Sequence, residues 1–183
     1  MRSLLPLVFA VALAAAGCFA STDESKQSST AAEGRQSHEP AGVVYVPAKG
    51  PGRRCSTAEA RAVVAHFIDA FNDGDLAALD RIFAPEGRFQ WYSTDAPGER
   101  LGDASYHRST LIEYFAERHQ RRERLELGSW KFNGNRGGFG HFQFQLTRGA
   151  ADLDGTPYDG KGAIDCRWRP RSIAVWAMSE LAS

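Results

Sequence analysis

The spacing of apolar residues is helical in the first part of the folded region. Apolar side chains recur every three or four positions over residues 60–71, which is the spacing of one buried helix face. Before this stretch, Ser56 and Glu59 have the spacing of a capping box, and after it Asn72-Asp73-Gly74 supplies a C-terminal stop. The pattern predicts a helix that begins next to Ser56 and ends at Gly74.

Two further helices are predicted downstream. Asp75 can cap a helix over residues 76–83, and Pro85 ends it because proline cannot continue a helix. A third helical pattern covers residues 110–124. Its predicted inward side chains are Leu111, Tyr114, Phe115 and Arg118.

The period then falls to two, which is typical of strands. Phe142, Phe144 and Leu146 alternate with polar residues, as expected for a sheet with one buried face and one wet face. The predicted strands are residues 89–92, 129–133, 140–148, 161–169 and 172–178. Because the helices precede an antiparallel meander, the predicted fold class is α+β.

The first 18 residues have the layout of a secretory signal peptide. Arg2 precedes an apolar run over residues 4–16, which spans about 20 Å as a helix and is too short for the ~30 Å membrane core. Ala15-Ala16-Gly17-Cys18 resembles the lipobox of bacterial lipoproteins, although Ala15 stands where Leu is usual. One interpretation is lipidation of Cys18 and anchoring at the outer face of the membrane. The other is an ordinary signal peptide, cut for instance after Ala20, and a secreted protein.

Residues 19–54 have the composition of a flexible tether. They are rich in Ser, Gly, Pro and charged residues, and a coil of this length spans about 30 Å. An apolar island at residues 43–46 either docks as an edge strand or stays unstructured. The predicted organisation is a signal peptide at 1–18, a tether at 19–54 and one domain at 55–183.

Charge and cysteine content narrow the possible functions. The 22 basic and 22 acidic residues give a net charge of zero, which provides no case for nucleic-acid binding. Three cysteines in an exported protein leave one without a partner, and lipidation of Cys18 would leave Cys55 and Cys166 as a pair. These two either form a disulfide that closes a loop of more than 100 residues or remain buried thiols.

The opening of the domain also carries a family resemblance. The sequence VVAHFIDAFNDGDL at residues 63–76, followed by Ile82-Phe83-Ala84-Pro85 and the strand at Phe89, resembles the nuclear transport factor 2-like superfamily, with its SnoaL-like and ketosteroid-isomerase-like branches. The resemblance implies a cystatin-like cone, in which a strongly curved antiparallel sheet wraps around the helices with a pocket between them. Members include isomerases, cyclases, dehydratases and non-catalytic modules, so the fold alone does not give the function.

Two of the three residues that the isomerase branch uses are replaced here. The resemblance places Phe67 at the position of a hydrogen-bonding Tyr and Trp91 at the position of an Asp base. Neither side chain can take over the role, which argues against steroid-isomerase chemistry. Ile164-Asp165 matches the dipeptide with the second acid. If Asp165 faces the interior, however, Cys166 faces outward, because neighbours on a strand alternate.

Three functional hypotheses follow. The first is a non-catalytic binder of a small apolar molecule. Its pocket would be lined by Phe67, Phe71, Phe89, Trp91, Trp176 and Met178, although the same side chains could simply fill the core. The second is an acid–base enzyme of the cyclase, dehydratase or isomerase type that uses Asp165 and His107. The third is a dimeric interaction module that uses the convex sheet face, with Gln143 and Gln145 exposed.

Two loop patterns superficially suggest ligands. Asp152, Asp154 and Asp159 lack the ligand spacing of an EF-hand, so a polar hairpin loop is predicted instead of a calcium site. The glycine-rich residues 133–140 lie between strands, whereas a phosphate-binding loop precedes a helix, so a flexible hairpin turn is predicted there. No metal or cofactor is expected.

Overall fold

The computed structural model describes residues 42–93 and 106–181, all within one compact unit, Gln36–Ser183. The signal peptide, Cys18 and residues 19–41 of the predicted tether lie outside the described residues. Export and lipidation therefore stay predictions. No helix among the described residues is long and apolar enough to cross a membrane.

The first two helices begin and end where local sequence predicts. Helix α1 is Thr57–Asp73; the Ser56 hydroxyl accepts from the Glu59 amide, and the Glu59 carboxylate accepts from the Ser56 amide at 2.8 Å. Gly74 ends the helix with a φ of 70°, a left-handed conformation that glycine adopts without strain. Helix α2 is Leu76–Ile82, and the Asp75 carboxylate accepts from the Ala78 amide at 2.8 Å.

The third helix, α3, is Arg108–Gln120 and begins two residues earlier than the sequence predicts. The reason is Arg108, whose buried guanidinium donates to the carbonyl oxygens of Ala84 at 2.6 Å and Phe83 at 2.9 Å. These bonds fix the first turn of α3 on the end of α2. The helix ends before residue 124 because Arg122 takes a positive φ of 58° and turns the chain into the sheet.

The sheet contains five strands in the order β2-β7-β5-β4-β3. Their bounds are β2 Gln90–Ser93, β3 Arg124–Arg136, β4 Phe139–Ala150, β5 Leu153–Asp165 and β7 Ser172–Glu180. Strands β3, β4, β5 and β7 pair antiparallel as predicted, whereas β2 runs parallel to β7. No hairpin joins β2 to β7, so turn geometry does not impose an antiparallel pairing on them.

Two predicted loops are largely strand. Residues 153–160, predicted as part of a polar hairpin loop, belong to β5, because Leu153 and Tyr158 are buried and anchor the strand. Only Ala151 and Asp152 form the turn. In the glycine-rich segment, the turn is confined to Gly137 and Gly138, whose φ values are 60° and 83°. Positive φ at both positions suits a two-residue hairpin.

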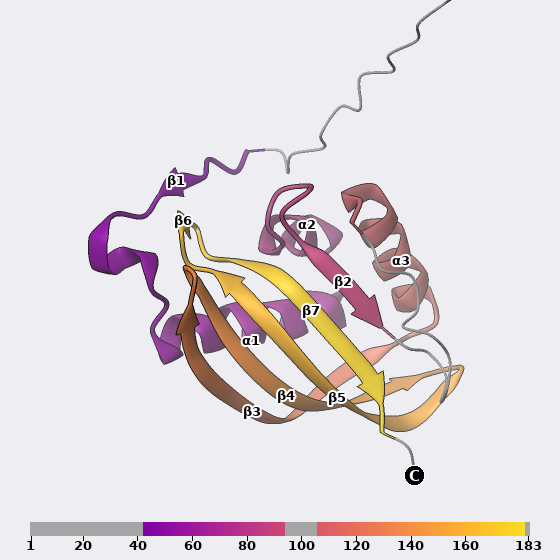
Figure 1. The fold of residues 1–183 in the computed structure, drawn as a ribbon. Helices are drawn as coiled ribbons and strands as arrows, with labels where there is room; N and C mark the ends of the chain where they lie inside the picture. The colour runs from indigo at the N-terminus through magenta and orange to yellow at the C-terminus, as the bar shows by residue number, and fades with distance from the viewer. Residues whose placement is uncertain (1–41, 94–105, 182–183) are drawn as a thin grey trace, which may run out of the picture. The chain divides into compact units, whose positions relative to one another are not determined.

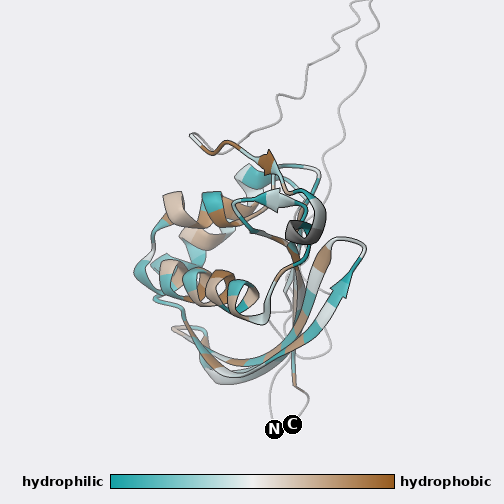
Figure 2. Cartoon of the chain, turned by 90° about the vertical axis from the view of Figure 1, so that its left-hand side faces the viewer, coloured by the Kyte–Doolittle hydropathy of each residue, from teal (hydrophilic) through white to brown (hydrophobic). Residues whose placement is uncertain are grey.

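The strands bend around the helices, which lie against one face of the sheet (Figure 1). Figure 2 shows the sheet edge-on, with α1, α2 and α3 inside its curve. Residues directly opposite each other on paired strands share a face, so the register places Phe142 beside Gly162 and Phe144 beside Gly160 on the helix side. The α+β class and the curved sheet are thus confirmed.

The segment before α1 is attached to the domain. Cys55 and Cys166 form a disulfide with a Cα–Cα distance of 5.3 Å, which confirms the predicted bridge. Strand β1, Val46–Pro47, pairs with β6, Trp168–Arg169, in a separate two-stranded sheet. The apolar island thus docks as a strand, and residues 45–54, assigned to the tether by composition, contact the folded domain.

Candidate functional site

The six residues predicted to line a pocket lie together in the interior, but they contact one another. The exposed fraction is between 0 and 3 % for each of Phe67, Phe71, Phe89, Trp91, Trp176 and Met178. The Phe67 ring centroid lies 4.5 Å from that of Trp176 and 5.9 Å from that of Trp91. These are the separations of packed aromatic pairs. The arrangement therefore fills the cone with side chains.

Glycines on β5 let the sheet close tightly on this aromatic cluster. A Cβ atom on Gly160 would lie 2.1 Å from the Phe144 ring, and one on Gly162 would lie 2.3 Å from the Phe142 ring. The Phe144 ring in turn lies 4.3 Å from Trp176, centroid to centroid. The rings thus occupy the space that side chains on the neighbouring strand would need, which leaves little room for a ligand.

Asp165 does not face the aromatic interior. It stands next to Ile164, which belongs to the hydrophobic core, and opposite Phe139 on β4. Its carboxylate accepts from the Arg167 guanidinium at 2.9 and 2.8 Å and from the Arg167 amide at 3.0 Å. Asp165 and Cys166 cannot both face inward, because neighbours on a strand alternate. The structure turns Cys166 inward, where it forms the disulfide.

His107 lies at a different place, directly before α3. Its side chain is 54 % exposed, and Nδ1 lies 3.0 Å from a Glu86 carboxylate oxygen. Asp165 is bound to Arg167, so the structure does not bring His107 and Asp165 together as a catalytic pair. Nor does the described part of the chain contain a cluster of three metal-ligating side chains.

A buried ionic cluster is the main polar feature that the sequence analysis missed. Arg148 has no exposed surface, and its guanidinium donates to the Glu123 carboxylate at 2.6 and 3.0 Å and to Ser93 Oγ at 2.9 Å. Arg118 donates to the same carboxylate and to both oxygens of Asp152, at 2.9 and 3.1 Å. Two arginines thus share one buried glutamate.

The contacts within the cluster favour the ionised forms of its side chains. Burial acts to lower the pKa of Arg148, but the hydrogen bonds to Glu123 and the fields of Tyr114, Glu123 and Tyr158 outweigh it and raise the pKa above its usual value. The hydrogen bonds from Arg118 lower the pKa of Asp152 to about 2, despite some opposing effect of burial. Because every charge has a partner, the cluster is suited to holding β3, β4 and α3 together rather than to proton transfer.

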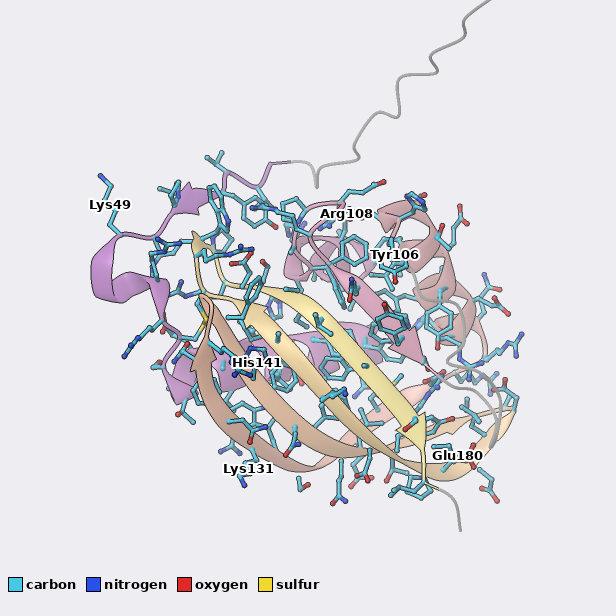
Figure 3. The ribbon with its side chains drawn as sticks, in the orientation of Figure 1. Lys49, Tyr106, Arg108, Lys131, His141 and Glu180 are labelled. Carbon is cyan, nitrogen blue, oxygen red and sulfur yellow. A yellow bond between two sulfur atoms is a disulfide. The ribbon has the colours of Figure 1, made fainter. Side chains whose placement is uncertain are left out.

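The sheet face away from the helices carries an open groove of about 740 Å³. The register sets two cross-strand rows beneath it. One row contains Lys131, Gln143, Lys161 and Ala177, and the other contains Ser129, Gln145, Asp159 and Ser179. Figure 3 labels Lys131 and, nearer the disulfide, His141 on these strands. The lining of this outer-face groove is mixed, because it combines the charged and polar residues of the two rows with Trp130, Phe144, Ala177 and Met178.

No family model and no curated protein matches the chain. Among solved structures, a proposed dehydratase of the NTF2-like family from Streptomyces avermitilis is similar, with a TM-score of 0.55 and 10 % identity over 69 % of this chain and 96 % of that one. The β subunit of benzoate 1,2-dioxygenase from Burkholderia mallei is similar with a TM-score of 0.53 and 12 % identity, over 69 % and 91 % of the two chains.

A proposed calcium/calmodulin-dependent protein kinase II association domain from Xanthomonas campestris is also similar. The TM-score is 0.55 and the identity 12 %, over 77 % of this chain and 99 % of that one. Other similar structures are described as cystatin-like. The protein is therefore an α+β protein of cystatin-like fold. More narrowly, the described unit has the nuclear transport factor 2-like fold.

Proposed function

We propose that the domain is a non-catalytic interaction module, exported and held at the outer face of a membrane, that pairs with a second copy of itself through the outer-face groove. The observation that carries the proposal is the contrast between the two sheet faces. The inner face is filled by aromatic rings, whereas the outer face has an open groove of about 740 Å³ lined by charged, polar and apolar residues. Of the three functions considered, this one requires no rearrangement of the interior.

The charges of the groove suit pairing between identical surfaces. Lys131 and Lys161 lie in one row and Asp159 in the adjacent row. A two-fold axis that runs between the two rows and parallel to them would place the lysine row of each copy against Asp159 of the other, so that the same patch serves both partners. The similarity in fold to a protein described as an association domain agrees with an assembly role.

Catalysis has less support than assembly. Asp165 is bound to Arg167, and His107 lies beside Glu86, so the two candidate groups take different partners. Binding of a small apolar molecule would need side chains such as Trp91 and Trp176 to separate, because they are packed with almost no exposed surface. A ligand of that kind would appear as a discrete added mass in a native mass spectrum.

The oligomeric state tests the proposal. Native mass spectrometry and sedimentation of residues 19–183, which begin directly after the predicted lipidation site, should show a dimer. Ala177→Arg places a large charged side chain in the groove and should weaken dimerisation at least about 10-fold, whereas Ala62→Arg, on an exposed part of α1, should leave it unchanged. A wild-type monomer at high concentration, or equal effects of the two variants, would contradict the proposal.

A further inference from the structure

The end of the domain where the chain enters from the tether carries three arginines around a small hollow. The hollow measures about 250 Å³, and its lining includes Arg53 and Arg54 from one side and Asn135, Arg136, Gly137 and Gly138 from the β3–β4 turn. All three arginine side chains are exposed. None of the three guanidinium groups forms an ion pair or a hydrogen bond with another residue that the structure describes.

The walls of this basic hollow are fixed by the fold. The Asn135 side chain accepts from the Cys55 amide at 2.8 Å and donates to the Cys55 carbonyl at 2.9 Å. Arg171 donates to the Arg54 carbonyl at 2.9 Å, and the disulfide of Cys55 adds a covalent link. Arg53 and Arg54 are therefore held beside Arg136 by the backbone next to them, while their guanidinium groups stay available.

The zero net charge of the chain hides an excess of positive charge at this end. The nearby acids are already used: Glu59 faces Arg169 and Arg171 at 3.2 and 3.4 Å, and Asp165 binds Arg167. Lys49 lies on the same segment as Arg53 and extends away from the domain (Figure 3). The arginines of the hollow, with Lys49, thus form a positively charged surface without an acidic partner among the described residues.

Exposed apolar side chains lie on the segment that precedes this basic surface in the chain. Val44 is 78 % and Val46 is 56 % exposed, and both belong to the segment that leads into the hollow. The segment is attached to the domain, because the Tyr45 hydroxyl donates to the Phe83 carbonyl at 3.2 Å and β1 pairs with β6. Basic and aliphatic side chains together are what a protein presents to a lipid interface, whereas a soluble anion would need only the arginines.

We infer that this end of the domain docks on an anionic lipid surface. Arg53, Arg54 and Arg136 bind headgroup phosphates, which guanidinium groups recognise through paired N–H donors, and Val44 and Val46 enter the headgroup layer. The predicted lipid at Cys18 would keep the chain at the membrane, so weak contacts suffice once the chain is anchored. The inference rests on the proposed function only for the nearby membrane and uses none of the groove residues.

Vesicle binding of residues 19–183, which lack Cys18 and its predicted lipid, tests the inference. The chain should bind mixed phosphatidylglycerol–phosphatidylcholine vesicles, bind pure phosphatidylcholine weakly, and lose binding as salt rises. Arg53→Gln/Arg54→Gln/Arg136→Gln should lower the partition coefficient by about 10-fold or more. The matched control is Arg81→Gln/Arg122→Gln/Arg124→Gln, which removes the same charge from exposed positions. Arg122 and Arg124 lie at or next to the end of β3 opposite the hollow, so this variant should bind nearly as well as wild type.

Further measurements separate the alternatives. Val44→Ser/Val46→Ser should weaken vesicle binding several-fold while leaving its salt dependence unchanged. Equal losses in the two arginine variants would overturn the inference, because net charge rather than this hollow would then govern binding. Saturable binding of inorganic phosphate without vesicle binding would overturn it in favour of a soluble anion. Sedimentation of the same variants reports dimerisation independently, so failure of the dimer and failure of docking are distinguishable.

Discussion

The two ends of β4 are held in the fold by different chemistry. At Gly140, near its start, the inner face meets the disulfide: a Cβ on Gly140 would lie 3.2 Å from the Cys55 Cβ and 3.3 Å from the Cys166 Sγ. At Arg148, near its end, the strand is fixed by Glu123: Arg148 donates to both oxygens of that carboxylate, and Arg118 donates to one of the same two. The first end packs against a disulfide between two residues outside β4, whereas at the second end a β4 side chain itself joins a buried ionic cluster.

The disulfide and the ionic cluster affect different thermodynamic states of the protein. A disulfide stabilises mainly by restricting the unfolded chain, so its contribution depends on redox state and on loop length. A buried ion cluster acts in the folded state, where each charge has lost its water and depends on its partners. The disulfide end should therefore respond to reductant, and the ionic end should respond to the loss of any one partner.

The largest effect is expected at the disulfide end. Cys55 and Cys166 are 111 residues apart, and closing a loop of that length contributes about 4 to 5 kcal/mol in the chain-entropy model. Cys55→Ala/Cys166→Ala should lower the free energy of unfolding in urea by about that amount, and reductant should reproduce the loss in the wild-type protein. Reductant should not change the double variant. A loss below about 1 kcal/mol would show that the unfolded chain already keeps Cys55 and Cys166 close together without the bridge.

The next effect is expected at the ionic end. Glu123→Gln removes the charge that Arg118 and Arg148 share, and should cost about 3 to 5 kcal/mol because two buried guanidinium groups lose compensation. Glu117→Gln is the matched control: Glu117 pairs with Arg121 on the surface, where both side chains are about half exposed, so its loss should cost under about 0.5 kcal/mol.

A combined substitution sharpens this comparison. Replacing Glu123, Arg118 and Arg148 together with Leu, Met and Met removes the charges and keeps much of the volume, and should cost less than Glu123→Gln alone. Equal losses in the single and triple variants would mean that packing, and not charge compensation, fixes this end. Thermal or urea unfolding of both variants decides between the two outcomes.

The features that sequence analysis predicted are those with a local signal or a simple count. The caps of α1 and α2 depend on residues within three positions of each other, and the alternation of Phe142, Phe144 and Leu146 is visible within β4. The disulfide followed from pairing two cysteines in an exported chain. The caps and the alternation depend on residues that are neighbours in sequence. The disulfide could be predicted because only two cysteines remain once Cys18 is set aside.

The features that were missed depend on contacts between distant residues. Arg148 and Glu123 are separated by 25 positions, and nothing local marks either side chain as buried. Strand β5 was shortened in the prediction because its Asp and Gly residues mask the alternation, although Gly160 and Gly162 are there to admit rings from β4. The position of Asp165 was ambiguous for the same reason: its partner, Arg167, lies beyond the end of the strand.

The smallest expected effect is the response of the ionic end to acid. Hydrogen bonds from Arg118 hold the pKa of Asp152 at about 2 in the folded protein, below its value of about 3.9 in an unfolded chain. A lowered folded-state pKa stabilises the protein above the unfolded value, and that contribution is lost as the pH falls from about 4 to about 2. The Asp152 side chain is 38 % exposed, so solvent screening limits the effect to about 1 kcal/mol or less.

The difference in unfolding free energy between wild type and Asp152→Asn should therefore be constant near neutral pH and should disappear below about pH 4. The gap between wild type and Cys55→Ala/Cys166→Ala should persist through the same range, because a disulfide does not titrate. If both gaps closed together, acid would be acting on the whole fold, and the two ends would not be independent.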